Sequence, residues 1–371
     1  MPDSPTEPNA TSVQPRLIIL ADDLTGALDS GVEFANVGLR VFAATTPHAI
    51  DEALVKQPEI LVVNTASREC CGDEAKRIHE RLHARFNDFV PTQIFKKVDS
   101  RLKGNICNEV NGLTGGDLSI DILCAPAIPD MGRLCEMGVL FGDGIDQSVN
   151  VRQHLSDVTA KLSVPDCLDQ EDLARVVDSI SGNTLLVGAR GLARALAQTL
   201  ATAPYRSRQS PHISRSLLAA IGSRDPITCR QIDSFLADAA ISHTHLQAAN
   251  GILPHRSASA DEQVLLQLTQ GNLSEDRTVV SDRFVKLSAE FVKTKQYDNV
   301  LACGGETAQG LLMELGIKVL EVRGELFPGV PVSTAQFDSW SFSLITKSGG
   351  FGDADLLTNL FQLISLSDFQ T

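Results

Sequence analysis

The residues RLIILADDLTGALDSGVEFANVG, from Arg16 to Gly38, decide the class of fold. The apolar run RLIIL has the length of a buried strand, and the polar loop ADDLTG follows it at once. In the next segment, 27–38, the apolar residues lie near helical spacing. A buried strand, a polar loop and a helix in this order are typical of the first half of a βαβ unit.

The same alternation continues along the whole chain. Strands that alternate with helices predict an α/β protein with a mainly parallel sheet that is covered by helices on both faces. Further strand candidates are LRVFAAT (39–45), EILVVNT (59–65), QIFKKV (93–98), DILCAP (121–126), NTLLVGA (183–189), SRSLLAAIGS (214–223), THLQAA (244–249), DNVLACGG (298–305), KVLEVRG (318–324), VPVSTAQ (330–336) and FSLITKSGG (342–350). Helices are expected over 73–86, from about 191, from 226, over 281–295, up to about 315 and over 353–364.

The length of the chain predicts two domains. At a prior of roughly 150 residues per domain, 371 residues are enough for two cores. We expect a disordered tail over 1–15, an N-terminal domain over 16–145 and a C-terminal domain over 146–371, each with its own mainly parallel sheet and with the active-site cleft between them. The segment CEMGVLFGDGIDQSV (135–149) resembles a hairpin with Gly142–Gly144 at its turn.

The charge and the cysteine pattern argue against several functions. A formal net charge of −14 repels phosphate backbones, so we expect no nucleic-acid partner. The eight cysteines form no CxxC pair and the eight histidines show no metal-ligand spacing, so we expect no metal site made by the protein alone. No apolar stretch approaches the ~20 residues of a membrane span, and the N-terminus does not have the pattern of a secretory signal. We therefore expect a cytoplasmic protein without a membrane partner, with a homodimer as a common assembly for such proteins.

Polar loops follow three strands of the N-terminal half, at the sheet edge where ligands of parallel sheets bind. Arginine and lysine bind carboxylate or phosphate there, and aspartate accepts hydrogen bonds from hydroxyl groups. Read separately, the first loop would only cap a helix, and Lys96 and Lys97 would be a solvated edge. Their recurrence at three strand ends favours a pocket for a small hydroxylated anion. The residues concerned are Asp22, Asp23, Thr25, Ser67, Arg68, Asp99, Ser100, Arg101, Lys103, Gly104 and Asn105.

Glycine loops follow three strands of the C-terminal half. They are AIGSRDP (220–226), CGGETAQG (303–310) and TKSGGFGD (346–353). Glycine pairs between a strand and a helix leave backbone N–H groups free to bind phosphate, although each pair alone is more often a tight turn. None of the loops matches GxxxxGK[ST] or GxGxxG, and the absence of GxGxxG argues against a dinucleotide oxidoreductase. Three such loops in one domain favour a nucleotide, so the two halves together suit phosphoryl transfer across a cleft.

Six stretches, taken together, resemble one known family. ADDLTGALDSGVEFANVGL, KKVDSRLKGN, IGSRDPIT, CGGETA, PGVP and ITKSGGFGD occur in the order typical of the four-carbon acid sugar kinases, from about residue 17 to 360. The resemblance implies ATP-dependent phosphorylation of a small sugar acid such as threonate or erythronate. It also implies an N-terminal domain that binds the acid and a C-terminal domain that binds ATP.

The resemblance also assigns roles to individual residues. From the chemistry of phosphoryl transfer we assign the base for the attacking hydroxyl to Asp23 or Asp99, with Asp22 orienting the substrate and Mg²⁺ bridging the phosphates of ATP. The residues implied to bind the acid are Asp22, Arg68, Lys97, Ser100, Arg101 and Lys103. Those implied to bind the nucleotide are Ser223, Gly304, Gly305, Glu306, Thr307, Gly349 and Gly350.

Three departures from the family pattern concern the substrate. The family motif Asp-Ser-Thr-Leu-Arg-Gly-Asn has Arg101 and Lys103 at its Thr and Arg positions here, and lysine cannot form a bidentate pair with a carboxylate. The segment 145–185 does not have the Asp-Pro-rich character of the family. The Gly-Ser-Cys-Ser loop is replaced by Gly-Ser-Arg-Asp over 222–225. A kinase for a branched or oxo sugar acid is therefore one alternative, and a nucleotide-gated acid-binding protein without turnover is another.

Overall fold

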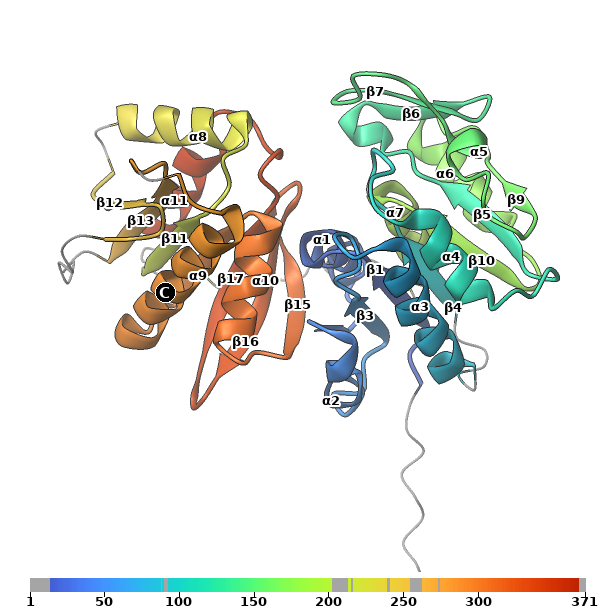
Figure 1. Cartoon of the computed structure of the whole chain (residues 1–371), viewed down its shortest axis with the longest axis horizontal. Coiled ribbons are helices and arrows are strands. Elements are labelled where there is room, and N and C mark those ends of the chain that lie inside the picture. The colour runs from blue at the N-terminus through green and yellow to red at the C-terminus, as the bar shows by residue number, and fades with distance from the viewer. Residues whose placement is uncertain are drawn as a thin grey trace, which may run out of the picture.

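The structure is a computed structural model that describes residues 14–87, 89, 93–201, 213–214, 216–238, 241–253, 262–272 and 274–366. Strands and helices alternate along the chain, and the large sheet is mainly parallel and flanked by helices (Figure 1). The predicted α/β class is therefore confirmed. The tail predicted over 1–15 lies, apart from its last two residues, outside the described residues.

The N-terminal half contains seven parallel strands in the order β2-β3-β1-β4-β10-β5-β9. Its central strands are almost wholly apolar because helices cover both faces of the sheet. The strands are β1 (Leu17–Ala21), β2 (Val41–Ala44), β3 (Ile60–Asn64), β4 (Gln93–Lys97), β5 (Asp121–Ala125), β9 (Leu162–Ser163) and β10 (Thr184–Gly188). The helices are α1 (Leu24–Asn36), α2 (Ile50–Leu54), α3 (Gly72–Phe86), α4 (Ile106–Thr114), α6 (Gln170–Asp178) and α7 (Arg190–Leu200).

The C-terminal half contributes the strand order β12-β13-β11-β14-β17-β16-β15, in which the last three strands are antiparallel. Helices α9 and α10 pack together, as do α8 and α11. The strands are β11 (Leu217–Ile221), β12 (Thr244–Ala249), β13 (Gln263–Thr269), β14 (Asn299–Cys303), β15 (Val319–Phe327), β16 (Val330–Phe337) and β17 (Trp340–Lys347). The helices are α8 (Pro226–Ala237), α9 (Arg277–Lys295), α10 (Gly305–Glu314) and α11 (Leu356–Leu366).

The two halves share one continuous sheet of 14 strands, whereas the sequence predicted a separate sheet in each domain. β2 pairs antiparallel with β15, from Val41 opposite Val322 to Ala44 opposite Val319. Pairing of these two strands leaves neither of them as an open edge. Helix α1 packs against β15 and β16 as well as against its own half, so its N-terminal loop lies where the halves meet (Figure 1).

The chain crosses between the halves later than the boundary expected after residue 145. β10 inserts between β4 and β5, so the segment up to α7 belongs to the N-terminal part of the sheet. The preceding residues form a small antiparallel sheet of β6 (Arg133–Glu136), β7 (Val139–Gly142) and β8 (Val149–Asn150), followed by α5 (Val151–His154). The predicted hairpin is present as β7 and β8, with Gly142–Gly144 at the start of their connection, and β6 is an additional strand.

Strand β13 and helix α9 also differ from the expectations. Strand β13 was not predicted, because its near-continuous apolar run cannot be distinguished from a buried helix by periodicity. Helix α9 begins at Arg277, four residues before the predicted start, where Asp276 accepts a hydrogen bond from the backbone N–H of Thr278. None of the described helices combines the length and the apolar character of a membrane span.

Candidate active site

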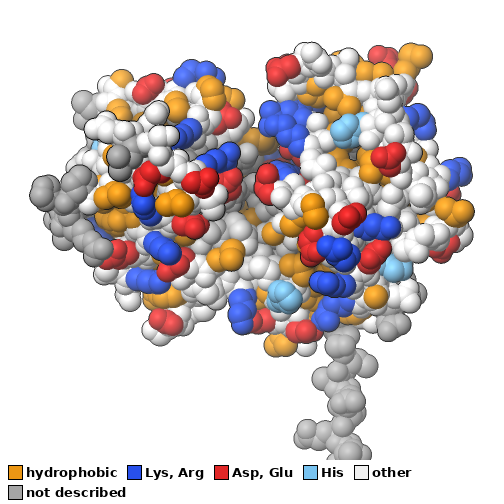
Figure 2. Space-filling view, in the orientation of Figure 1, with side chains coloured by type: hydrophobic (Ala, Val, Ile, Leu, Met, Phe, Trp, Pro, Cys, Tyr) orange, Lys and Arg blue, Asp and Glu red, His pale blue; other side chains and the backbone are white. Residues whose placement is uncertain are grey.

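Two adjoining cavities lie between the halves, where the surface of the molecule is hollowed (Figure 2). The smaller has a volume of about 70 Å³ and the larger about 840 Å³. Four residues line both cavities: Asp23, Thr25, Arg68 and Ser348. Because only the larger cavity has the volume of a nucleotide site, the shared wall is the place where a small molecule and the end of a nucleotide would meet.

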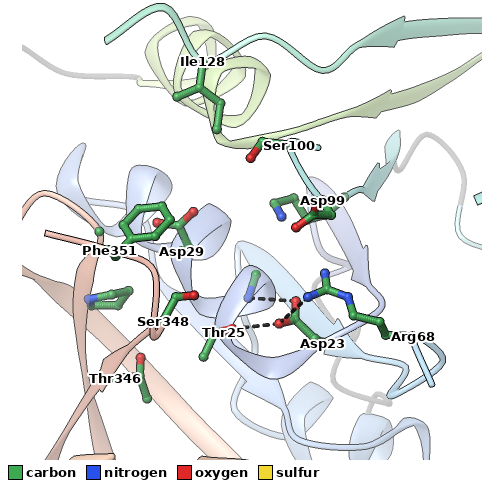
Figure 3. Close-up of a pocket in the computed structure, with 14 residues that line it drawn as sticks. Asp23, Thr25, Asp29, Arg68, Asp99, Ser100, Ile128, Thr346, Ser348 and Phe351 are labelled. Atoms are coloured by element: carbon green, nitrogen blue, oxygen red, sulfur yellow. Dashed lines mark hydrogen bonds and ion pairs between the residues drawn. The ribbon is translucent and has the colours of Figure 1, made fainter. Parts of the chain in front are cut away.

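Both halves build the smaller cavity, which we call the acid pocket (Figure 3). Helix α1 and the loops after β3 and β4 form one side, and the C-terminal half closes the other side through the β15–β16 loop and the end of β17. Its lining residues are Asp23, Thr25, Gly26, Asp29, Arg68, Lys97, Asp99, Ser100, Ile128, Gly329, Pro331, Thr346, Ser348 and Phe351.

Asp22 and Arg68 form a bidentate ion pair at this wall. Arg68 donates from Nε to Asp22 Oδ2 and from Nη2 to Asp22 Oδ1, both at 2.8 Å. Burial of Asp22 favours its neutral form, but Lys96, Arg68 and Lys97 outweigh this and hold the pKa of Asp22 below its usual range. The stabilisation from this pair is therefore present above about pH 4 and is lost as the pH falls through the lower pKa of the folded state.

Asp23 caps helix α1 and leaves little of its carboxylate free. Its Oδ1 accepts from the backbone N–H of Gly26 at 3.0 Å, and its Oδ2 accepts from Thr25 Oγ1 at 2.7 Å. Arg68 Nη1 lies 3.0 Å from the same Oδ2. Only glycine fits at position 26, because a Cβ there would lie 2.4 Å from Asp23 Oδ1 and 2.9 Å from Lys97 Nζ.

A buried ion pair supports the loop that carries Arg68. Lys96 Nζ lies 2.9 Å from Glu109 Oε2, and both side chains are 0% exposed. Glu109 also accepts a hydrogen bond from Ser67 Oγ, next to Arg68. The alternative interpretation of Lys96 as part of a solvated edge is therefore excluded, because Lys96 is a buried cation that fixes this part of the site.

The glycine loop CGGETAQG (303–310), at the start of α10, lies directly against the acid pocket. A Cβ on Gly305 would lie 3.6 Å from Thr25 Oγ1 and 3.7 Å from Asp23 Oδ2. No side chain caps the N-terminus of α10, whose N-cap residue is Gly304 with φ +106°. Free N–H groups and the helix dipole at such an end favour an anion in the larger cavity.

The other two glycine loops pack against each other beside α10. Thr228 Oγ1 donates to the carbonyl of Gly349 at 2.7 Å, and Asp225 caps α8 through the N–H of Ile227. Lys347 Nζ donates to the carbonyl of Ser348 at 3.1 Å, and burial lowers the pKa of this lysine. A Cβ on Gly349 would lie 2.2 Å from Ser223 Oγ, so the loops fit only when residue 349 has no side chain.

We expect Gly349→Ala to weaken the binding of a nucleotide in the larger cavity by about ten- to a hundredfold, because overpacking of this kind costs about 1–3 kcal/mol. Titration calorimetry with Mg·ATP measures the dissociation constant. Gly350→Ala is the matched variant, because its Cβ would lie 3.4 Å from Asp225 Oδ2, an ordinary contact, and its effect is expected to be smaller. Equal effects of the two substitutions would contradict this account of the glycine loops.

Most of the sequence-predicted residues lie on the two cavities. The acid pocket has Asp23, Asp99, Arg68, Lys97 and Ser100, and the larger cavity also has Asp22, Arg101, Ser223, Gly304, Gly305, Glu306, Thr307, Gly349 and Gly350. Lys103 is exposed and lines neither cavity. The roles of these residues stay predictions, and Arg101 lies on the nucleotide-sized side rather than in the acid pocket.

Sequence reasoning missed several lining residues. Ser348 and Phe351 lie within the quoted motif ITKSGGFGD, and Asn250 directly follows a predicted strand, so the strand-end rule could have found all three. Val280 and Phe284 come from helix α9 and give the larger cavity an apolar wall. Arg277, also on α9, pairs with Glu306 at 2.6 Å at this cavity.

Asp29 is the missed residue with the most unusual surroundings. It lies on α1 one turn after Thr25 and Gly26 and lines the acid pocket with them. Burial raises the pKa of Asp29 to about 6; Arg190 and Lys97 act against the shift, and Glu33 and Glu325 add to it. Arg190 Nη1 lies 3.3 Å from Asp29 Oδ1, and this arginine also pairs with Glu33 and Glu325.

Two family models match the chain. The model described as a sugar-binding N-terminal domain matches residues 17–156, and the model described as a nucleotide-binding C-terminal domain matches residues 243–357. The first covers the N-terminal side of the acid pocket. The second contains the loop before α10 and the last glycine loop on the larger cavity.

Several characterised proteins are similar over almost their full length. A D-threonate kinase of Bordetella bronchiseptica is 27% identical over 401 residues, which cover 94% of this chain and 98% of that protein. A 3-oxo-tetronate kinase of Burkholderia multivorans is 22% identical, with 93% of this chain and 96% of that protein covered. A solved structure of a Salmonella typhimurium LT2 protein, provisionally described as a tRNA synthase, superposes with a TM-score of 0.73 at 18% identity and covers 93% of this chain and 98% of that one. This likeness shows a shared fold.

Proposed function

The chain belongs to the four-carbon acid sugar kinase family, and we propose that it transfers the γ-phosphoryl group of ATP to a hydroxyl group of a threonate-like sugar acid. It is a phosphotransferase that acts on a four-carbon sugar acid. The observation that supports transfer from ATP to a threonate-like acid is the contact between the two cavities. Gly305 at the N-terminus of α10 lies against Thr25 and Asp23 of the acid pocket.

The acid binds in the smaller pocket through its charged and hydroxyl groups. Arg68 and Lys97 supply positive charge for the carboxylate, and Ser100 supplies a hydroxyl group. Arg68 is held in place by Asp22 and Asp23 and therefore does not need to reorganise when the acid binds.

ATP binds in the larger cavity with its phosphates towards the shared wall. The uncapped start of α10 and the loops around Ser223 and Gly349 offer backbone N–H groups to the phosphates. The apolar wall of Leu268, Val280 and Phe284 suits the base. The γ-phosphoryl group then reaches the wall formed by Asp23, Thr25, Arg68 and Ser348, where the acid presents its hydroxyl group.

Mg²⁺ fits this site as an ion held mainly by phosphates and water. The described residues contain no cluster of three His, Cys, Asp or Glu side chains that could hold a metal ion. Asp225 and Glu306 are carboxylates on the nucleotide side that would contribute ligands. When bound, the ion neutralises charge on the phosphates that develops during the transfer.

The choice between D-threonate and a 3-oxo acid rests on the N-terminal side of the acid pocket. Relatives of both names match this chain at 22–27% identity, so similarity alone does not select one. Arg68 and Ser100 can donate to either a hydroxyl or a carbonyl group, whereas Asp99 can accept only from a hydroxyl group. We propose the hydroxy acid, because the pocket carries three aspartates, which accept from hydroxyl groups but repel a carbonyl oxygen.

Mass spectrometry of the acid after incubation with Mg·ATP tests the proposal. The expected product is the acid with one added phosphoryl group, formed from D-threonate faster than from 3-oxo-tetronate. Faster phosphorylation of the 3-oxo acid would overturn the substrate proposal, and no phosphorylation of any acid would overturn the proposed function.

A further inference from the structure

The acid pocket contains three aspartates, and each has different hydrogen-bond partners. Asp23 uses both of its carboxylate oxygens, to cap α1 and to hold Arg68. Asp99 Oδ2 accepts hydrogen bonds from the backbone N–H groups of Arg101 at 2.9 Å and Lys103 at 3.5 Å. Asp29 receives one charged contact, from Arg190 to Oδ1. Within the described part of the chain, Asp29 Oδ2 accepts no hydrogen bond.

The position of Asp29 is also fixed more firmly than that of Asp99. Asp29 lies inside helix α1, whereas Asp99 lies in the loop after β4. Its partner Arg190 is 3% exposed, and donates from Nε to Glu33 and from Nη2 to Glu325 on β15. The guanidinium is therefore held from both halves of the molecule, and it holds Asp29 in one orientation.

The exposed part of Asp29 faces the acid pocket. Its side chain is 16% exposed, and it lines the pocket together with Gly26, Lys97, Ser348 and Phe351 (Figure 3). Thr25, one turn before it on α1, lies at the wall that Gly305 contacts. A four-carbon acid that fills the pocket and presents a hydroxyl group at this wall therefore lies within one helical turn, about 5.4 Å along α1, of Asp29.

We propose that Asp29, rather than Asp23 or Asp99, accepts the proton of the attacking hydroxyl group. In this step the hydroxyl oxygen forms a bond to the γ-phosphorus, the bond from that phosphorus to the oxygen of the leaving ADP breaks, and the hydroxyl proton passes to Asp29 Oδ2. The proton then leaves to solvent, so ATP and the acid give ADP, the phosphorylated acid and a proton. The inference rests on the proposed function.

The surroundings of Asp29 suit a base that works near neutral pH. Its pKa of about 6 leaves it ionised at pH 7 and still basic enough to accept a proton. The charged groups around it are Lys97 on β4, Arg190 on α7, Glu33 on α1, Glu325 on β15 and Arg133 on β6. Since the base must be unprotonated, kcat should rise with pH up to an apparent pKa near 6 and then level off.

The test compares Asp29→Asn with the wild type and with Asp51→Asn. D29N is expected to lower kcat by about 100-fold or more, with an unchanged dissociation constant for Mg·ATP and without the acid limb of the pH profile. D29E restores a carboxylate and should regain both activity and the acid limb in part. D51N makes the same substitution at an exposed aspartate that lines neither cavity, so its kcat should stay within a few-fold of the wild type.

The outcomes separate the inference from the function on which it rests. If the wild type turns over and D29N keeps a kcat within threefold, or keeps the acid limb, the inference is wrong while the proposed function stands. If D51N loses as much kcat as D29N, the loss is a general effect of an Asp→Asn replacement, and the base assignment is also wrong. If the wild type phosphorylates no acid, the proposed function and the inference both fail.

Discussion

Replacing Arg68 with lysine is expected to lower kcat/KM for the sugar acid by about 1,000-fold. Arg68 joins Asp22 and Asp23 through three charged contacts and lines both cavities. Lysine offers a single point charge and cannot bind Asp22 in a bidentate manner while it also faces the acid. Losing two charged hydrogen bonds at about 1.5–3 kcal/mol each accounts for an effect of this size.

Steady-state kinetics with the acid as the varied substrate measures the effect. Arg85→Lys is the matched control, because Arg85 pairs with Asp51 at the surface and lines neither cavity. We expect this control to keep kcat/KM within about twofold, since exposed ion pairs contribute little. An R68K enzyme within tenfold of the wild type would show that Arg68 does not bind the acid or the transferred group.

Replacing Lys96 with methionine is expected to destabilise the protein by about 3–5 kcal/mol. The substitution leaves the carboxylate of Glu109 buried without its cation, and uncompensated buried charge is costly. The double variant K96M/E109L removes both charges and should recover most of the loss, because apolar residues often replace a buried pair at little cost.

Urea titration gives the free energy of unfolding of each variant. Lys318→Met is the matched control, because Lys318 and Glu52 form a pair that is 65% and 55% exposed, and we expect a change of less than about 1 kcal/mol. A double variant as unstable as K96M would show that the loss comes from packing rather than from the unpaired charge. Wild-type stability of K96M would contradict the account of the pair altogether.

Strand-end reasoning predicted much of the candidate site because the sheet is mainly parallel. Asp22, Asp99 and Gly304 each follow a strand, and a parallel sheet brings such residues to one edge. The apolar runs were long and regular enough for the class of fold to be predicted. These predictions depended only on local pattern and on a general rule of topology.

The pairing of β2 with β15, which connects the halves, could not be predicted from local pattern. Neither β2 nor β15 shows in its own sequence that it pairs with a strand more than 270 residues away. The position of β10 between β4 and β5 is a long-range pairing of the same kind, and the boundary after residue 145 was placed only from the local pattern of strands and helices.

Asp29 and Lys96 were missed for a related reason. Asp29 is a polar residue on an amphipathic helix, and only the tertiary structure shows that this face of α1 lines a pocket. Lys96 directly precedes Lys97 at the end of a strand, and the burial of Lys96 depends on Glu109 from helix α4. In both cases the role comes from a partner distant in sequence.

The most direct test of the whole account is ADP release with Mg·ATP, measured by a coupled assay against a panel of four- to six-carbon sugar acids. The account predicts little ADP release without acid and a strong acceleration by D-threonate or a close four-carbon relative. ATP binding by calorimetry without acceleration by any acid of the panel would contradict it, and it would show that the wall shared by the two cavities is not a site of phosphoryl transfer.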